Sequence, residues 1–429
     1  MTSSKLIGCN IRGNIKVSPL ALKIIDTPEF QRLRNIKQLG VCQYVFPAAT
    51  HTRFEHSIGT YYLTSKMVEK LQKSYPDKIY NIPDIGQSQL TDFVCELIKI
   101  AGLCHDIGHG PFSHVFDELL SNNHHETRSC LIIEKICQRE LQLSTHHIKF
   151  IQSIINPQPQ HKGALYQIVS NYLNGIDVDK FDYLARDSYM LGLNRGFDPG
   201  RIIDEIIIDD NGNIAYPKHC ASDIYDIFQN RYMLHKQIYN YKTVKIIEMM
   251  LCDIFRKIDP IFKFSDMITD MDQFCSLTDN SFFNILENIV KPMNYLRPMI
   301  EQKHMNLILE AYDIYQNIIQ RKLYKCVAEV CGNSFDEFID YLKEENICID
   351  NLEVIKFDVG YVSGDKGNPF DSIYFYDKQN ASSYLLDKNQ ISIILCNGYM
   401  ENYCFLICKS RVEYVDILEK YVEYMKREK

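Results

Sequence analysis

The chain has 429 residues, of which 46% are hydrophobic and 24% charged, so it can bury a large core in more than one lobe. A net charge of −8 argues against a protein that coats nucleic acid; a single-stranded nucleic-acid partner is possible but is not indicated by the sequence. The polar N-terminus and the lack of a roughly 20-residue apolar run predict no signal peptide and no membrane partner. The 15 scattered cysteines favour a reducing location, cytoplasmic or nuclear.

The first 60 residues have the opposite charge balance to the chain as a whole. They hold eight Lys and Arg residues against three Asp and Glu residues. A basic region in an acidic protein fits a pocket for a phosphorylated ligand better than a DNA-binding face, and a solvated basic surface is the alternative.

Helical periodicity dominates residues 17–260. We expect helices at 19–36, 60–73, 91–106, 126–138, 176–187 and 223–257. The last is rich in aromatic residues that belong by default to the core, but Arg231, His235 and Tyr239 recur every four residues and form a polar face that could line a cleft. The Asp-Asp-Asn-Gly-Asn run within 206–217 predicts a hairpin on the helical body.

The pattern changes towards the C-terminus. Residues 265–345 are expected to be helical, and short strands follow at 353–361, 372–376, 383–386, 391–396 and 403–408, before a closing helix at 411–427. The expected fold is therefore mainly α with a C-terminal α+β lobe. We expect a catalytic domain at 1–260, a helical extension at 261–345 and a regulatory or oligomerisation lobe at 346–429.

The adjacent pair His105-Asp106 is a candidate metal-binding element. Imidazole and carboxylate groups both bind borderline divalent ions. Adjacent residues point about 100° apart on a regular helix, so such a pair chelates more easily at a helix end. Gly108, Gly110 and Pro111 supply that end, since they stop the preceding helix. Taken alone, a His-Asp dipeptide is also compatible with a solvated helix terminus.

The neighbourhood of this pair favours phosphate chemistry. His105, His109 and His114 fall within ten residues, and Asp117 and His125 follow closely. Clusters of histidines and carboxylates are expected where a reaction needs metal ligands, proton donors and charge neutralisation.

Three stretches of the chain, 46–57 (FPAATHTRFEHS), 101–114 (AGLCHDIGHGPFSH) and 175–187 (GIDVDKFDYLARD), closely resemble the HD-domain deoxynucleoside triphosphate triphosphohydrolases. Residues 24–40 (IIDTPEFQRLRNIKQLG) and 368–371 (NPFD) extend the resemblance over nearly the whole chain. The most similar members are the animal enzymes with a sterile-alpha-motif domain, and no such domain is expected ahead of this match.

The resemblance implies roles for individual residues. The implied metal ligands are His56, His105, Asp106 and Asp179. The implied triphosphate contacts are Arg53, Lys180 and Arg231, with His235 beside them. The implied catalytic histidines and their supporting carboxylate are His109, His114, His125 and Asp117. The implied sugar pocket contains Gln38, Leu39, Tyr183, Asp187 and Tyr239. Asp179, Tyr183 and Asp187 are four residues apart, so one helix face could carry all three.

Several of these residues also admit simpler interpretations. Arg53 could pair with the nearby Glu55, and Lys180 could be solvated. Asp187 could form a surface salt bridge, which would contribute little either way. Tyr239, taken alone, is more often a core residue than part of a substrate gate.

The chemistry implied by the family is hydrolysis of a dNTP to a deoxynucleoside and inorganic triphosphate. A divalent metal (Fe, Zn or Mn at the His/Asp site, with Mg on the triphosphate) would activate the attacking water and neutralise charge. His114 would protonate the departing 5′ oxygen. Tyr239 would exclude ribonucleotides by a clash at C2′.

Regulation is expected to be only partly conserved. Asp26, Gln31 and Arg34 match residues that read a guanine activator, so GTP or dGTP is an expected activator and a dimer or tetramer an expected state. The family's activator loop NDPIHG reads GCNIRG at 8–13. In the second activator site Pro217 replaces an Arg and His219 a Lys, whereas Arg201 and Lys242 are retained, and the loop between Asp117 and His125 is shorter.

Two other classes of protein remain as alternatives. Another HD phosphohydrolase, acting as a nucleotidase or phosphodiesterase, would keep the metal ligands but would not need the whole sugar pocket. A non-catalytic nucleotide-sensing or nucleic-acid-binding scaffold would be expected to have lost ligands, and here all four are present. Analysis of the reaction products discriminates between the three.

Overall fold

The computed structural model describes residues 4–120, 124–193, 198–290, 301–362, 367–378, 380–391 and 398–427. The chain folds into two compact units: Met1–Asn230 with Phe264–Phe282 and Gly367–Leu395, and Arg231–Lys263 with Phe283–Lys366 and Cys396–Lys429. This division differs from the three consecutive domains expected from the sequence, because two distant segments pack onto the N-terminal part.

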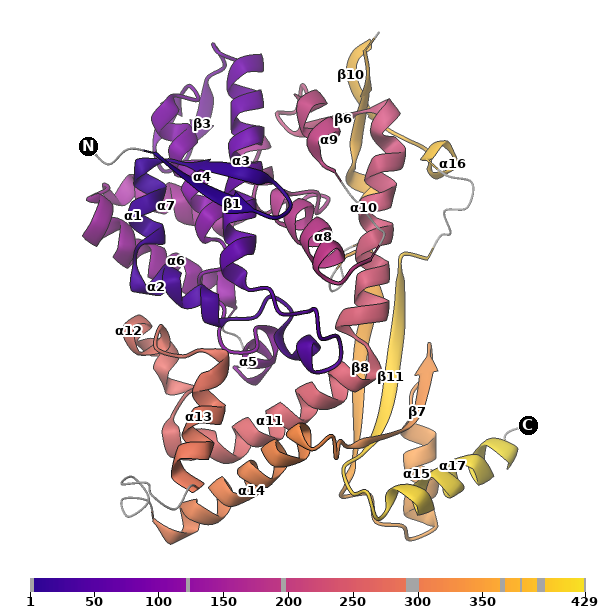
Figure 1. The fold of residues 1–429 in the computed structure, drawn as a ribbon. Helices are drawn as coiled ribbons and strands as arrows, with labels where there is room; N and C mark the ends of the chain where they lie inside the picture. Colours follow the sequence, from indigo (N-terminus) through magenta and orange to yellow (C-terminus); the bar gives the residue numbers. More distant parts are fainter. Residues whose placement is uncertain are drawn as a thin grey trace. The chain divides into compact units, whose positions relative to one another are not determined.

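Three helices form the centre of the first unit: α3 (Arg53–Ser74), α4 (Asp92–Cys104) and α8 (Val178–Met190) (Figure 1). Helix α3 packs against both of the others. It begins with a capping box, in which Thr52 and Glu55 satisfy each other's amides. A side chain at Gly59 would overlap Asp182 and Arg186 of α8, so this glycine lets the two helices approach closely.

Further short elements surround these helices in the first unit. They include the hairpin β1 (Lys5–Cys9) and β2 (Gly13–Val17), helices α1 (Pro19–Ile25), α2 (Pro28–Gln31), α5 (His114–Leu119), α6 (His125–Ile136), α7 (Thr145–Ile155), α9 (Gly200–Glu205) and α12 (Met271–Phe274), and the hairpin β3 (Tyr80–Ile82) and β4 (Gly86–Ser88). The 3-10 turns η1 (Arg32–Asn35) and η2 (Gly40–Tyr44) lead into α3.

The first unit also contains a four-stranded sheet in the order β10-β9-β6-β5. The expected hairpin at 206–217 is present as β5 (Ile207–Ile208) and β6 (Ile214–Pro217). Strands β9 (Tyr374–Asp377) and β10 (Asn380–Leu385) join it, with β9 parallel to β6. These two strands were expected in the C-terminal lobe, but their backbone hydrogen bonds place them here. The short helix α16 (Lys388–Ile391) follows.

The second unit combines helices with a three-stranded antiparallel sheet. Helix α10 (Ala221–Leu234) enters it at Arg231, followed by α11 (Lys242–Phe262), the end of α13 (Asp279–Val290), and α14 (Gln302–Ile319). The sheet order is β7-β11-β8, with β11 (Met400–Cys408) between β7 (Lys325–Cys331) and β8 (Leu352–Gly360) (Figure 1). Helices α15 (Asp336–Glu344) and α17 (Tyr414–Arg427) contribute Phe338, Leu342 and Ile417 to its core. The fold class, mainly α with a C-terminal α+β lobe, is confirmed.

Three expectations about individual elements were wrong, and a fourth lies almost entirely outside the described residues. The helix expected at 19–36 is broken before Pro28, where Thr27 caps a new helix. The helix expected at 223–257 is interrupted by a π-helical turn at His235–Tyr239 and restarts at Lys242. The region 265–345 contains strand β7. The strand expected at 391–396 falls outside the described residues except for Ile391, which ends α16.

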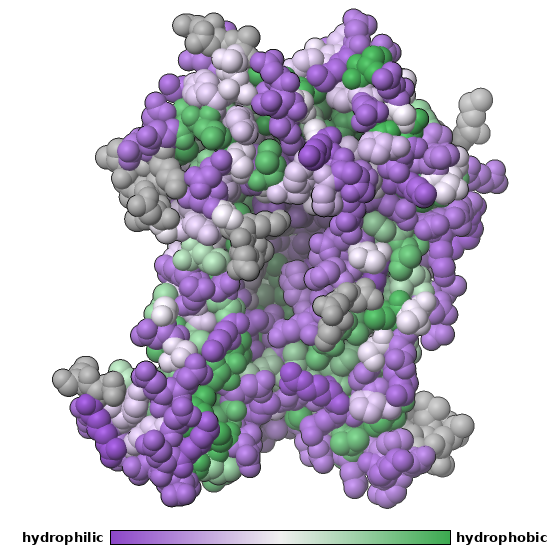
Figure 2. Space-filling model, turned by 180° about the vertical axis from the view of Figure 1, so that it is seen from behind, coloured by the Kyte–Doolittle hydropathy of each residue, from purple (hydrophilic) through white to green (hydrophobic). Residues whose placement is uncertain are grey.

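Hydrophilic side chains cover most of the face shown in Figure 2, with apolar ones scattered among them. Across the described residues, none of the helices has the length and apolar character needed to cross a membrane.

Candidate metal centre and active site

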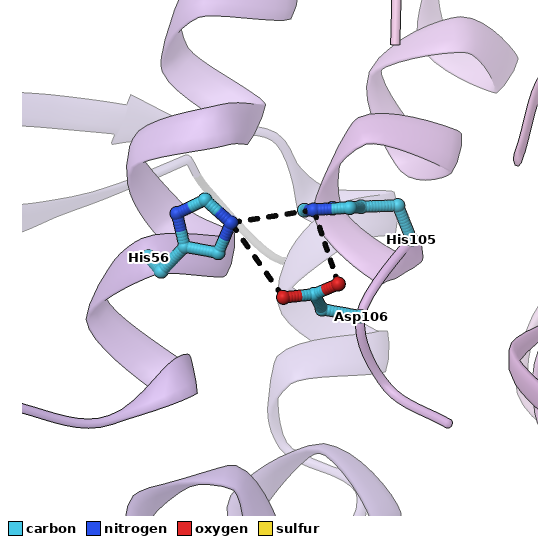
Figure 3. A group of neighbouring side chains, drawn as sticks. All are labelled: His56, His105 and Asp106. Carbon is cyan, nitrogen blue, oxygen red and sulfur yellow. Dashed lines mark hydrogen bonds and ion pairs between the residues drawn. The ribbon is translucent and has the colours of Figure 1, made fainter. Parts of the chain in front are cut away.

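Four side chains of the first unit converge on one point. His56 comes from α3, His105 and Asp106 directly follow α4, and Asp179 lies in the first turn of α8. Nε2 of His56 lies 3.3 Å from Nε2 of His105 and 3.6 Å from Oδ2 of Asp106 (Figure 3). Oδ1 of Asp179 lies 3.1 Å from His56 and 3.4 Å from His105. The structure therefore brings together all four predicted ligands.

These separations fit a small divalent cation. An ion held at roughly 2.0–2.2 Å by nitrogen and oxygen donors requires donor atoms about 3.0–3.5 Å apart. The two Nε2 atoms lie 3.3 Å apart, and the Asp106 carboxylate places Oδ1 3.4 Å from that of His105 and Oδ2 3.6 Å from that of His56. In the absence of a cation, two imidazole nitrogens at 3.3 Å would have only one proton to share at best, so the donor set itself suits a metal.

The far side of each imidazole is fixed by an acceptor. Nδ1 of His56 lies 3.0 Å from Oδ2 of Asp182, and Nδ1 of His105 lies 3.0 Å from the carbonyl oxygen of Gly102. A proton on each Nδ1 leaves the Nε2 lone pairs directed at the shared point, as in most His-metal sites. Asp182 is in turn held by two hydrogen bonds from Arg186, at 2.8 and 3.1 Å.

The electrostatics of the site also favour a cation. Burial lowers the pKa of His56, but Asp179, Asp182 and Asp106 outweigh it and raise that pKa to about 10. Burial raises the pKa of Asp106, but His105 and Arg53 lower it well below its ordinary value. The carboxylates thus remain ionised, and the site stabilises positive charge placed between them.

Arg53 contacts this pocket and does not pair with Glu55. Its Nη1 forms a close ion pair with Asp106, and its Nε donates to Oγ of Ser113 at 3.0 Å. Glu55 accepts from the backbone N–H of Thr52 at 3.1 Å and so caps α3. The Arg53 guanidinium is therefore fixed beside the metal ligands, where an anionic ligand would meet it.

Three imidazoles gather next to Asp106. The rings of His109 and His125 are stacked with centroids 3.8 Å apart, and the ring of His114 lies 5.6 Å from that of His109. Nε2 of His109 lies 3.3 Å from Asp106, and Asp117 lies 3.3 Å from His125. His114 is exposed whereas His109 is buried. Asp106, His109 and His125 also form a second group compatible with a cation.

The residues predicted to hold the sugar are only partly linked to one another by direct contacts. Gln38 hydrogen-bonds through its backbone N–H to the carbonyl oxygen of His51 at 3.0 Å, and Nε2 of His51 lies 2.7 Å from Asp187. Gln38 and Asp187 are thus linked through His51, a residue the sequence analysis missed. The carboxamide oxygen of Gln38 is buried and has no hydrogen-bond partner within the described residues. Leu39 follows Gln38 and is half-buried.

The other predicted ligand-binding residues of α8 lie on the expected helix. Tyr183 is half-buried and Asp187 buried, four and eight residues after Asp179. Lys180 places its Nζ 3.2 Å from Asp177, which also caps α8. Lys180 is therefore paired, not solvated.

Arg231, His235 and Tyr239 belong to the second unit. Arg231 is buried and donates to the carbonyl oxygen of Gly360. His235 and Tyr239 begin and end the π-helical turn, with ring centroids 4.9 Å apart. Their expected contacts with a substrate remain predictions.

The residues predicted to read a guanine activator lie near the start of the first unit. Nε of Arg34 donates to Oε1 of Gln31 at 2.8 Å, and its guanidinium lies 3.6 Å from the ring centroid of Phe54. Asp26 is exposed at the end of α1. In the described chain, Arg34 is therefore positioned by Gln31 and Phe54, and no Arg34–Asp26 ion pair forms.

The loop that carries His109 is held by buried side chains that the sequence analysis also missed. Arg32 donates to the carbonyl oxygens of Ile107 and His109 at 3.2 and 2.5 Å, and Arg128 donates to that of Gly108 at 2.8 Å. The N–H of Gly108 donates to Oγ of Ser129 at 2.9 Å. Burial lowers the pKa of Arg32 to about 10, so this guanidinium stays charged at neutral pH.

Comparison with known proteins agrees with this geometry. The HD domain model matches residues 53–187. The chain is 52% identical to an HD domain-containing protein, L394, of Acanthamoeba polyphaga mimivirus, over 95% of this chain and 92% of the relative. It is 33% identical to the deoxynucleoside triphosphate triphosphohydrolase SAMHD1 homolog of Dictyostelium discoideum, over 95% of this chain and 78% of that protein. Human SAMHD1 is 34% identical over 94% of this chain and 70% of its own length.

The helical fold and the His/Asp centre define a divalent-metal hydrolase of the HD-domain class. Within that class, the chain belongs to the family of the SAMHD1 deoxynucleoside triphosphate triphosphohydrolases.

Proposed function

We propose that the chain hydrolyses dNTPs to a deoxynucleoside and inorganic triphosphate. One observation carries the proposal: two oriented imidazoles and two ionised carboxylates meet at cation-binding distances beside a buried Arg53. A metal site next to a fixed guanidinium suits a polyphosphate ligand, because both neutralise negative charge. The relatives with 33–34% identity bear this activity in their names.

The cation proposed for the centre is Fe, Zn or Mn, with Mg accompanying the triphosphate. When bound, it supplies Lewis-acid chemistry, lowering the pKa of water and offsetting charge on the phosphates. His56, His105, Asp106 and Asp179 would hold it, and Asp182 keeps His56 in the tautomer that binds.

The chain's own residues would position the substrate and move the protons. Arg53 and Lys180 would hold the triphosphate, exchanging their present partners Asp106 and Asp177 for phosphate oxygens. Arg231 and His235 are assigned to the triphosphate by the family resemblance. His114 is the proposed donor to the 5′ oxygen, because its ring is exposed beside the buried His109.

The sugar would lie against Gln38, Leu39 and the Tyr183–Asp187 face of α8, with Tyr239 excluding a 2′-hydroxyl. The unpartnered carboxamide oxygen of Gln38 supports this assignment, because a buried acceptor needs a donor and the sugar 3′-hydroxyl can provide one.

Regulation, assembly and location form a further part of the proposal. Asp26, Gln31 and Arg34 would bind GTP or dGTP, which would activate a homodimer or homotetramer. The changes at 8–13 and at Pro217 would weaken the need for a second activating dNTP. The proposed location is the cytoplasm or nucleus.

The test is incubation of the metal-loaded protein with each dNTP, with and without GTP, followed by product analysis. Release of inorganic triphosphate is expected. Release of phosphate or pyrophosphate instead would favour a different HD phosphohydrolase, and no turnover of any nucleotide would favour a scaffold.

A further inference from the structure

A buried carboxylate outside the matched HD domain contacts two backbone segments of the proposed active site. Asp279 begins α13, about 90 residues beyond the end of the match at 187, and is only 5% exposed. Its Oδ2 accepts the backbone N–H of Lys37 at 2.7 Å, and its Oδ1 accepts that of Phe112 at 2.8 Å. One side chain thus joins two segments that are far apart in the sequence.

Both of these segments lead directly into proposed substrate-binding or catalytic residues. Lys37 precedes Gln38 and Leu39 of the sugar pocket, and Phe112 precedes Ser113 and His114. A second bridge runs alongside, since Oγ of Ser113 donates to the carbonyl oxygen of Lys37 at 3.2 Å and accepts from Arg53. Asp279 therefore lies where the sugar-binding segment, the proposed proton donor and the phosphate-binding arginine are connected.

The backbone at this point is of a kind that needs support. Phe112 and Ser113 both have φ of 55°, a left-handed conformation that residues with side chains rarely adopt. Gly40 approaches the same turn: with φ of 50°, a Cβ there would come within 3.1 Å of the carbonyl oxygen of Phe112. Two consecutive left-handed residues persist only where surrounding contacts impose them, and Asp279 makes one of those contacts directly.

The choice of an ionisable group here is costly for folding. Burial raises the pKa of Asp279 to about 6, although its two amide donors and the charges of Arg53 and Arg32 oppose that shift. A carboxylate can accept both N–H groups with its two oxygens, whereas an asparagine offers one acceptor and one donor. The geometry explains why an acid is present despite its burial.

We infer that Asp279 is a positioning residue for the proposed dNTP hydrolysis, fixing the sugar-binding segment at Gln38 relative to the proton donor His114 through the amides of Lys37 and Phe112. The inference rests on the proposed function but adds a residue outside the HD match. A positioning role predicts two effects of substitution that a loss of stability alone would not produce. These are a loss of turnover in a folded, metal-loaded protein and a loss of discrimination between dNTPs and NTPs.

The test compares Asp279→Asn and Asp279→Ala with wild type and with Asp266→Asn. The last makes the same chemical change at an exposed residue of the same 264–282 segment. The measurements are kcat and KM for dATP and ATP by triphosphate release, metal content by mass spectrometry, and melting temperature. A displacement of about 1 Å can cost roughly 100-fold in rate, so Asp279→Ala is expected to lose about that much kcat and Asp279→Asn roughly tenfold.

The inference is supported if Asp279→Asn is folded and binds metal like wild type, but has a lower kcat and a smaller dATP-to-ATP preference, while Asp266→Asn does not differ from wild type. It is overturned if Asp279→Asn keeps the kcat and selectivity of wild type, or if its activity falls only in proportion to lost metal or lost folded protein. Should Asp279→Ala fail to fold, Asp279→Asn still decides. Failure of the proposed function would look different, because wild type itself would then release no triphosphate.

Discussion

Nδ1 of His56 lies 3.0 Å from Oδ2 of Asp182, while Nε2 of the same ring faces the other three proposed ligands. The carboxylate therefore determines which nitrogen is available to a metal. Asp182 is completely buried and paired with Arg186 one turn further along α8, so the imidazole is held in one orientation by two successive contacts. Substituting a residue that orients a ligand, such as Asp182, therefore tests the proposed metal site in the same way as substituting a ligand.

Asp182→Asn should weaken metal binding and activity by roughly 10–100-fold, the usual effect of changing a partner of a ligating histidine. The reason is that the asparagine amide can accept from Nδ1 but no longer carries the charge that fixes the tautomer. Metal titration followed by triphosphate release measures it. The exposed Asp204→Asn is the matched control, and unchanged metal affinity in Asp182→Asn would contradict the role assigned here.

Asp106→Ala should abolish turnover, a larger effect than that of an outer contact, because it removes a charged ligand and the partner of Arg53. The change deletes little core volume, so the folded structure should persist. Bound metal, circular dichroism and triphosphate release are the measurements, with the exposed Asp77→Ala for comparison. A folded Asp106→Ala protein with full activity would rule out the proposed centre.

The wild-type protein should hydrolyse dATP in preference to ATP, and Tyr239→Ala should reduce that preference by roughly tenfold or more, the range typical of a steric pocket. The physical reason is removal of bulk next to the proposed position of C2′. Steady-state kinetics with the two nucleotides give the ratio, and Tyr241→Ala, a change at an exposed tyrosine just beyond the π-helical turn, serves as control. Equal rates for ATP and dATP with the wild-type protein would argue decisively against this pocket.

GTP or dGTP should raise activity by roughly fivefold or more, the low end of ordinary allosteric coupling, and should favour a larger assembly. Asp26 can accept hydrogen bonds from the guanine N1 and N2 positions, and Arg34 can bind a phosphate. Light scattering and triphosphate release across a GTP titration, for wild type and Asp26→Ala, would measure both effects. Identical mass and rate at every concentration would reject the regulatory site and leave catalysis unaffected.

The stability of the protein should depend on the ionisation of Asp279. Its pKa of about 6 in the folded protein exceeds the ordinary Asp value, so folding favours the protonated form. This preference contributes fully to the free energy of unfolding below about pH 4. The contribution is lost as pH rises through about 6, which lowers the free energy of unfolding by about 3 kcal/mol at pH 7. Denaturant unfolding of wild type and Asp279→Asn between about pH 4 and 7 should show wild type losing relative stability as pH rises. A constant difference would mean that Asp279 does not titrate in this range.

The ligand set could be predicted from sequence because its members lie in short, distinctive motifs around His56, His105 and Asp179. The partners that orient them could not. His51 lies within one of those motifs, but its contact is with Asp187, 136 residues away. Asp279 lies in no motif at all, and only the folded chain brings it to Lys37 and Phe112. Contacts between distant segments have no periodic or compositional signature in the sequence.

The errors in secondary structure have a similar origin. Strand β1 was missed because none of its residues is buried, so it lacks the alternation of apolar and polar residues by which a half-buried strand is recognised. The long helix expected at 223–257 showed good periodicity on both sides of the π-helical turn, since one extra residue shifts the apolar stripe without erasing it. The hairpin at β5 and β6 was found because its turn has a strong local signal.

The hydrogen bonds from buried side chains to the backbone of the loop at residues 107–113 should limit local opening of the active site. The amides of Gly108 and Phe112 donate to buried side chains, and the carbonyl oxygens of Ile107, Gly108 and His109 accept from buried guanidinium groups. This loop contains no regular hydrogen-bonding ladder, yet these amides should exchange with solvent deuterium as slowly as those of the neighbouring helices. Hydrogen exchange at Gly108 and Phe112 would therefore report the integrity of the catalytic centre itself, without any substrate present.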